Sequence, residues 1–303
     1  MRNGYYIVLL AFVLIACLPD PLPVRNVPSP ENTVVIGSQN LPEQFLAIAV
    51  TENFNALEGG REDDYEALIR SLLIDSLEIT VEVAGDIYEL QNPDSGLYVG
   101  TDVPELPGEL YTLSFENPFN ERPVTATAEL LPFVGFDTVD IFIEANEFDT
   151  IVNVSLKLQD PPGPNWYMSN VQLINEDFDY DVNPFTELFT DEGQDGELIE
   201  YDFRVFFRDY EKGDTVFVSL ANISQDYYEF LDLRGTRRPF VGSLGEPINY
   251  PTNVENGLGY FHMHIPDVRI FLPGFFEVES NGIDLSILVT DEDEVRGATH
   301  QKL

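Results

Sequence analysis

The sequence predicts a mainly β protein, in which an N-terminal immunoglobulin-like β-sandwich is followed by a second β-rich domain with one short helix. Short runs in which apolar and polar residues alternate recur along most of the chain, and this period-two pattern is typical of strands with one buried face. Turn-forming Gly, Pro, Asn and Asp residues separate the runs at short, regular intervals. The chain has 303 residues and is 44% hydrophobic, with 22 Phe and 14 Tyr, which is enough for two packed cores.

The first seventeen residues predict an export signal with a site for a lipid. Arg2 supplies a positive charge, and residues 5–16 form an apolar run shorter than the about 20 residues that span a bilayer. The run ends in Leu-Ile-Ala-Cys at 14–17, which resembles the lipobox of bacterial lipoproteins. We therefore expect removal of the signal peptide, 1–16, and acylation of Cys17; the alternative is an ordinary signal peptide with a chance cysteine.

The residues after the signal predict a stiff tether. Five prolines fall within 18–30, and proline holds a chain extended and out of helices. We therefore assign 17–31 to a Pro-rich tether between lipid and body. Cys17 is the only cysteine, so no disulfide framework is expected.

The charge of the chain limits its partners. With 54 acidic and 15 basic residues, the net charge is −39. Such a surface repels nucleic acids, so no nucleic-acid partner is expected. The acidity suits a cationic partner or divalent cations, but we favour the simpler interpretation, a surface that keeps the protein in solution.

The N-terminal domain is predicted over 32–131. Residues 63–76 have helical spacing of leucines and are interpreted as a crossover or loop insert, and residues 92–96 are a predicted turn. The strand candidates are 33–37, 45–51, 77–83, 87–90, 97–99, 110–115 and 124–130.

The C-terminal β-rich domain is predicted over 132–303. Its short helix covers 224–234, with Ser224 as the cap, and the acidic stretch 175–200 is expected to contain a long loop. The strand candidates are 138–144, 150–158, 166–174, 201–207, 215–222, 259–265, 268–272 and 283–289.

Four stretches carry a family resemblance, and the most distinctive is 248–261, INYPTNVENGLGYF. Together with the lipobox, they resemble a Bacteroidota outer-membrane lipoprotein family called domain of unknown function 4249. The resemblance implies a lipid-anchored protein of the outer membrane, at the cell surface or the periplasmic face, often encoded beside a TonB-dependent transporter. Of the two faces, we favour the cell surface. It implies no ligand. The other three stretches are 126–132, 160–167 and 216–228.

The same 248–261 stretch holds the candidate residues for partner binding. Gly and Asn permit positive φ and give an adaptable backbone, so a partner-facing loop is one hypothesis. A structural turn that closes the sheet is the other. The candidates are Asn253, Asn256, Gly257, Gly259 and Tyr260.

No metal or other cofactor is expected, although two groups have weak metal-binding patterns. His262 and His264 share a strand face, but a firm site needs three or four ligands. Asp177, Asp179 and Asp181 alternate as in a calcium loop, but the later positions of that motif do not match. The loop 191–197 is acidic without a complete motif.

Four Asp-Ser/Thr-aliphatic triplets resemble the O-glycan acceptor pattern of exported Bacteroidota proteins. The acceptors would be Ser76, Thr138, Thr150 and Thr215. Alternatively, Asp-Thr simply opens strands, because Asp suits turns and Thr suits strands.

The sequence contains no G-x-S-x-G, H-E-x-x-H or Walker motif. We therefore predict no enzyme, but an accessory of a TonB-dependent transporter that helps it capture or gate a substrate. A secreted hydrolase with an acidic pair and a surface adhesin or structural lipoprotein are the alternatives.

Overall fold

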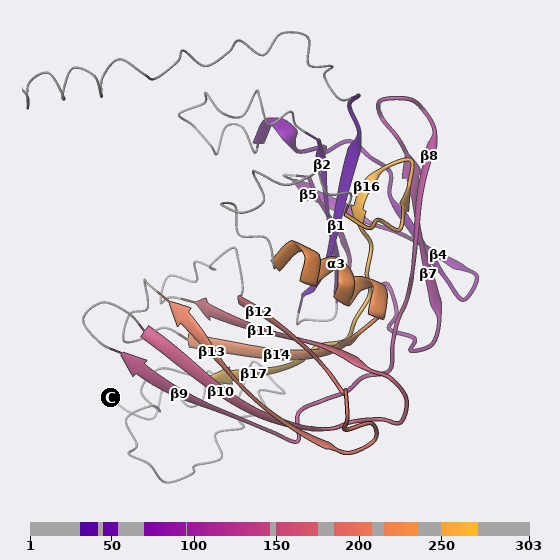
Figure 1. Ribbon diagram of the computed structural model, residues 1–303. Helices are drawn as coiled ribbons and strands as arrows, with labels where there is room; N and C mark the ends of the chain where they lie inside the picture. The colour runs from indigo at the N-terminus through magenta and orange to yellow at the C-terminus, as the bar shows by residue number, and fades with distance from the viewer. Residues whose placement is uncertain are drawn as a thin grey trace, which may run out of the picture.

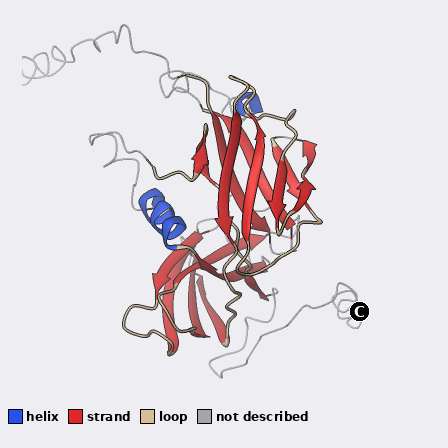
Figure 2. Cartoon of the chain, turned by 90° about the vertical axis from the view of Figure 1, so that its right-hand side faces the viewer, coloured by secondary structure: helices blue, strands red, loops and turns tan. Residues whose placement is uncertain are grey.

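The computed structural model describes residues 31–41, 45–53, 70–94, 96–145, 150–174, 185–207, 215–235 and 250–271. These residues form a mainly β protein with two sandwich-like halves and helix α3 beside them (Figures 1 and 2). This confirms the predicted fold class. No helix in the described ranges is long and apolar enough to cross a membrane.

The first half, here called the N-terminal sandwich, has two five-stranded sheets around one core. The alternation in the sequence explains this packing: in β7, for example, Tyr111, Leu113 and Phe115 are buried while the residues between them are more exposed. One sheet has the order β16 (Leu258–Tyr260), β1 (Val34–Leu41), β2 (Phe45–Glu52), β6 (Leu97–Gly100) and β5 (Gln91–Asp94). The other has the order β15 (Val254–Glu255), β8 (Pro123–Glu129), β7 (Leu110–Glu116), β3 (Thr80–Val83) and β4 (Asp86–Glu89).

The second half, the C-terminal sandwich, packs a three-stranded sheet against a four-stranded sheet around a separate core. Valines and leucines that alternate along β10 and β14 point into it. The first sheet has the order β13 (Leu198–Phe207), β10 (Thr150–Gln159) and β9 (Thr138–Ala145). The second has the order β12 (Phe185–Thr190), β11 (Trp166–Ile174), β14 (Thr215–Ile223) and β17 (Asp267–Phe271).

Helix α3 (Gln225–Gly235) covers the outer face of the four-stranded sheet at one end. Below it, Met168, Ala221 and Ile223 are buried as a third apolar cluster. This explains why the end of β14 is buried on both faces. The predicted helix at 224–234 is therefore confirmed, with a shift of one residue.

The single domain boundary predicted at 131/132 does not hold for residues 254–263, which were assigned to the C-terminal domain. β15 pairs with β8, and β16 pairs in parallel with β1, so both strands belong to the N-terminal sandwich. Val254, Phe261 and Met263 lie in its core. The apolar pattern of these residues predicts burial, but it does not reveal which of two cores they enter.

Other differences concern single elements. β12 was not predicted, because it lies in the acidic stretch that we expected to contain a long loop. The predicted strand 259–265 pairs only as far as Tyr260. Of the predicted helix 63–76, residues 70–72 are helical and 73–76 are not, while 63–69 lie outside the described residues. The signal peptide, most of the tether and the strand predicted at 283–289 also lie outside the described residues.

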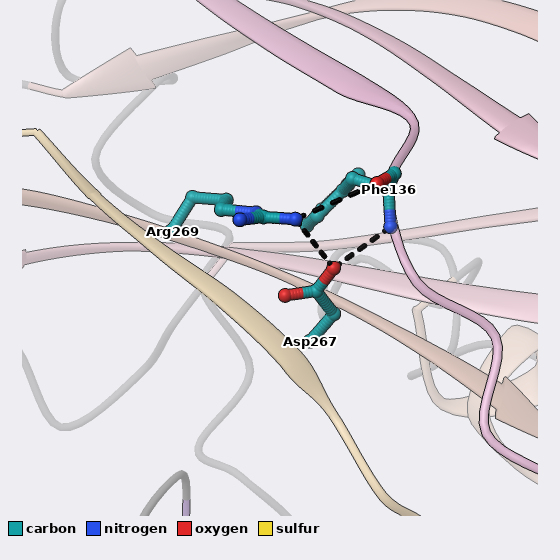
Figure 3. A network of polar contacts seen from close by, with 3 residues as sticks. All are labelled: Phe136, Asp267 and Arg269. Atoms are coloured by element: carbon teal, nitrogen blue, oxygen red, sulfur yellow. Dashed lines mark hydrogen bonds and ion pairs between the residues drawn. The ribbon is translucent and has the colours of Figure 1, made fainter. Parts of the chain in front are cut away.

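A polar network ties the connection between the halves to β17 (Figure 3). The Phe136 amide donates to Asp267 Oδ2 over 2.8 Å, and Arg269 Nη2 lies 3.0 Å from the same oxygen. The Arg269 guanidinium also stands over the Phe136 ring, 5.9 Å from its centroid. The network fixes the chain where it enters the C-terminal sandwich.

Candidate functional site

The candidate partner-binding segment forms a turn that is held by hydrogen bonds from its own asparagine side chains. Asn253 spans it: its Nδ2 donates to Phe261 O over 2.7 Å and to Thr127 O over 2.8 Å, and its Oδ1 accepts from Phe261 N over 2.9 Å. Asn253 therefore joins both ends of the turn to β8. One side-chain amide therefore bonds three backbone groups.

Positive φ angles allow this turn to pack tightly. Asn256 has φ of 58°, and its Nδ2 donates to Pro123 O over 2.8 Å. Gly259 has φ of 94°, and a Cβ there would lie 1.9 Å from Ile36 O. A Cβ at Gly257 would lie 2.8 Å from a Val254 methyl carbon. These contacts give the Asn and Gly residues a structural role; partner binding by the segment stays a hypothesis.

Beyond the turn, the chain runs extended between the N-terminal core and α3. Phe261 and Met263 are buried in that core, and Ile265 packs against it. The intervening His262 and His264 point the other way, as period-two geometry requires. The sequence prediction that both histidines share a face is therefore correct.

The two histidines and Tyr227 of α3 form a stack of three rings, here called the ring column. The centroids of Tyr227 and His262 are 3.9 Å apart with an interplanar angle of 16°, and those of His262 and His264 are 5.2 Å apart with an angle of 17°. Tyr260 packs beside the column, and its ring centroid lies 5.3 Å from that of Tyr227 and 5.1 Å from that of Phe230. Through these rings, α3 contacts the N-terminal sandwich.

The helix that supplies Tyr227 is positioned from its start. Ser224 Oγ accepts a hydrogen bond of 3.3 Å from the Tyr227 amide, as expected for an N-terminal cap. Tyr227, Tyr228 and Leu231 also pack against the cluster of Met168, Ala221 and Ile223. The helix therefore touches both sandwiches and is the joint between them.

Burial governs the protonation of the two histidines. Burial, and then the neighbouring His264, lowers the pKa of His262 well below its usual 6.5. Burial lowers the pKa of His264 to about 4. Both rings are therefore neutral near pH 7. The backbone of His262 is held by Ser38, whose Oγ accepts from the His262 amide over 2.6 Å and donates to the His262 carbonyl over 2.9 Å.

The described residues bring together one group of three potential metal ligands, and it does not include these histidines. Asp160, Asp191 and Asp195 each offer an oxygen within 4.8 Å of the others. The first two are buried and the third is exposed. The sequence predicted an acidic loop at 191–197 but did not identify Asp160 as a neighbour of that loop. The turn-forming Asp-Pro-Pro-Gly-Pro-Asn run at 160–165 is the sequence feature that marks Asp160.

These carboxylates, here called the carboxylate turn, already have hydrogen-bond donors. Asp160 accepts from the Tyr167 hydroxyl and, over 2.7 Å, from the Gly196 amide. Asp191 accepts from the Asn165 amide over 2.9 Å. Burial and the Asp160 carboxylate raise the pKa of the Tyr167 phenol, so it stays a donor. The bonds explain the cluster as a clamp between two loops, and oxygen ligands of this kind can also hold a divalent cation.

The remaining sequence candidates are dispersed. Ser76 and Thr138 are exposed and Thr215 is half-buried, while Thr150 opens β10. Trp166 is partly buried and packs against the cluster beneath α3. Cys17 and the alternating Asp177, Asp179 and Asp181 lie outside the described residues.

The family model described as "Domain of unknown function (DUF4249)" matches residues 23–264, which is most of the chain. This chain belongs to that family. The matched range includes the carboxylate turn. It also includes residues 250–264, here called the closing segment, which complete the core of the N-terminal sandwich. No curated protein matches the chain.

The solved structures that resemble this DUF4249 chain do so with low sequence identity and low TM-scores. The chicken interferon gamma receptor alpha chain is 10% identical, with coverage of 64% of this chain and 90% of that one and a TM-score of 0.18. A DUF4785 family protein from Legionella pneumophila is 9% identical, with coverage of 62% and 52% and a TM-score of 0.19. Latent PorU from Porphyromonas gingivalis is 11% identical, with coverage of 68% and 20% and a TM-score of 0.19.

Proposed function

We propose that this chain is a non-enzymatic lipoprotein of the outer membrane that helps a TonB-dependent transporter to capture or admit a substrate. The observation that carries the proposal is the lipobox at 14–17, followed by a Pro-rich tether, in a chain of the DUF4249 family. A lipid and a stiff spacer would hold the folded body close to the membrane and to any barrel embedded in it.

The proposal includes a contact surface on the N-terminal sandwich. Leu258 and Tyr250 are large apolar residues of the closing segment, residues 250–264, and they are 45% and 43% exposed. The hydrogen bonds of Asn253 and Asn256 and the close glycine contacts hold this segment in place, so binding would order few side chains. Exposed apolar residues on a rigid turn suit a partner protein.

The two alternatives, a hydrolase and an adhesin or structural lipoprotein, differ from this proposal in the site or the partner that they require. The acidic pair of a hydrolase would be sought at Asp160 and Asp191, yet both carboxylates accept backbone hydrogen bonds from facing loops. That geometry favours a structural clamp over an acid and base open to a substrate. An adhesin or structural lipoprotein would share the anchor and the rigid body but would have no barrel partner.

The test is a pull-down of the full-length protein from native outer membranes in mild detergent. We expect a TonB-dependent barrel to co-purify at near-equal stoichiometry. Recovery of the lipoprotein alone would contradict the proposal; turnover of a glycan or peptide polymer would then favour the hydrolase, and no turnover would favour the adhesin. Intact mass of the recovered protein also tests for acyl groups on Cys17 and for glycans at Ser76, Thr138, Thr150 and Thr215.

A pair of variants tests the contact surface. Leu258→Ser should lower the yield of the barrel, because it removes exposed apolar surface from the closing segment. Ile87→Ser is the matched control: Ile87 is 68% exposed and lies on β4, in the other sheet of the same sandwich. Equal barrel yields from the two variants would reject the surface while leaving the accessory role intact.

A further inference from the structure

The ring column joins parts of the chain that belong to different sandwiches. Tyr227 lies on α3, which packs on the C-terminal sandwich, whereas His262 and His264 lie on the segment that completes the N-terminal core. We propose that the ring column is an acid-sensitive latch, which holds α3 against the N-terminal sandwich and releases it when His262 and His264 take up protons.

The latch is favourable only with neutral rings. His262 and His264 are 2% and 6% exposed, and their centroids are 5.2 Å apart. His262 Nε2 is buried and has no hydrogen-bond partner among the described residues. A proton on Nε2 would therefore place a donor and a charge where no acceptor stands. A second proton would set two like charges against each other in a buried site.

The charged groups of α3 near the column act on its tyrosines. Burial raises the pKa of the Tyr260 phenol, and Asp226 and Glu229 add to that rise. Burial also raises the pKa of Tyr227, and Arg234 partly opposes this rise. On the N-terminal side, Ser38 of β1 meets the His262 backbone with a neutral hydroxyl. For the imidazoles themselves, burial is the main cause of the lowered pKa values.

The direction of the pH effect follows from these values. Once released into water, the rings would regain a pKa near 6.5, whereas the latched His264 has a pKa of about 4. Between these values the released form binds more protons, so falling pH favours release. The ratio of released to latched protein should rise by up to about tenfold per pH unit for each ring. The latch is complete above pH 6.5 and weakens toward pH 4.

The chain carries its own reporter of release. Trp166 is the single tryptophan, and it packs with Tyr227 and Leu231 against the cluster beneath α3. When α3 leaves, water reaches the indole and its emission shifts to longer wavelength. The carboxylate turn lies nearby, because Asp191 accepts a hydrogen bond from the amide of Asn165, the residue before Trp166. The histidine contribution is therefore separated by substitution.

The experiment follows the emission of Trp166 in the mature full-length protein from about pH 7 to about pH 4, with far-UV circular dichroism recorded alongside. We expect a red shift that begins below pH 6.5 while the β signal is retained. His262→Phe/His264→Phe keeps stacked rings that cannot titrate, and it should abolish this shift. His300→Phe alters the third histidine of the chain and should leave the shift unchanged.

Three results would overturn the latch: no shift in the wild type, the same shift in the double variant, or loss of the β signal together with the shift, which would be global unfolding. If the double variant does not fold, Tyr227→Leu replaces it. This variant removes the ring on the helix side, so the emission should already be red-shifted at about pH 7 and should change little with acid. A wild-type pH profile in Tyr227→Leu would reject the proposal.

Discussion

Single residues of the DUF4249 motif hold the fold by backbone geometry. Gly259 combines a φ of 94° with an Ile36 backbone that leaves no room for a Cβ, which would lie 1.9 Å from Ile36 O. Gly37, which follows Ile36 on β1 and pairs with Tyr260, has open space at the Cβ position. Sequence reasoning identified the Asn-Gly-rich turn, since these residues permit positive φ. It could not identify Ile36 as the close neighbour, because that contact spans most of the chain.

Gly259→Ala should therefore destabilise the protein by about 3 kcal/mol, the sum of a left-handed backbone and a steric clash. Gly37→Ala is the control in the paired strand, and its effect should stay within about 1 kcal/mol. Urea unfolding measures both free energies. Equal small effects would show that the close approach of β16 to β1 is absent.

The carboxylate turn gives a second prediction for single residues. Asp160→Asn should lower the free energy of unfolding by about 2 kcal/mol, because hydrogen bonds from Tyr167 and Gly196 to a buried charged acceptor are weakened. Asp195→Asn, at the exposed member of the cluster, should cost less than about 1 kcal/mol. If Asp160→Asn instead stabilises the protein, repulsion among the three carboxylates outweighs the clamp.

At the level of elements, local sequence patterns predicted whether a segment is a strand or a helix better than they predicted which strands pair. Alternation located most strands, and Ser224 marked the start of α3. β12 escaped because its neighbours in sequence are acidic and its own pattern is only weakly buried. The extended run after Tyr260 has strand periodicity without strand pairing, because side chains of Ser38 and Asn253 bond its backbone in place of a ladder. Periodicity cannot distinguish these two environments.

Ser38→Ala tests how that run is held. The hydroxyl accepts from the His262 amide and donates to its carbonyl, so its loss leaves two backbone groups without this partner. We expect a loss of about 1–3 kcal/mol, together with faster amide exchange at His262. Thr33→Ala is a suitable control, because the Thr33 hydroxyl makes only an exposed local bond to Glu31 O. Unchanged exchange at His262 would contradict the role of Ser38.

On the scale of the whole molecule, the two sandwiches are interlocked. The chain builds most of the N-terminal sandwich, then the C-terminal one, and finally returns to close the first core with Val254, Phe261 and Met263. It then supplies β17 to the second. A linear division into domains could not anticipate this return. The same path places α3 and the ring column where both halves meet.

Interlocking predicts that both sandwiches unfold together, in a single calorimetric transition near neutral pH. Phe261→Ala should move that whole transition downward, because it removes about 3–5 kcal/mol from a core to which residues 34–130 and 254–263 both contribute. Phe119→Ala is the control, since Phe119 is 38% exposed, and it should shift the transition little. Two separate transitions, of which Phe261→Ala moves only one, would contradict the interlocked fold.

The accessory role is tested most directly by native mass spectrometry of the full-length protein extracted from its own outer membrane. We expect one species whose mass equals that of the acylated lipoprotein plus one TonB-dependent barrel. The Cys17→Ser variant, which lacks the lipid attachment site, should lose this species. Recovery of a lipoprotein that carries its lipid but no barrel would rule out the accessory role.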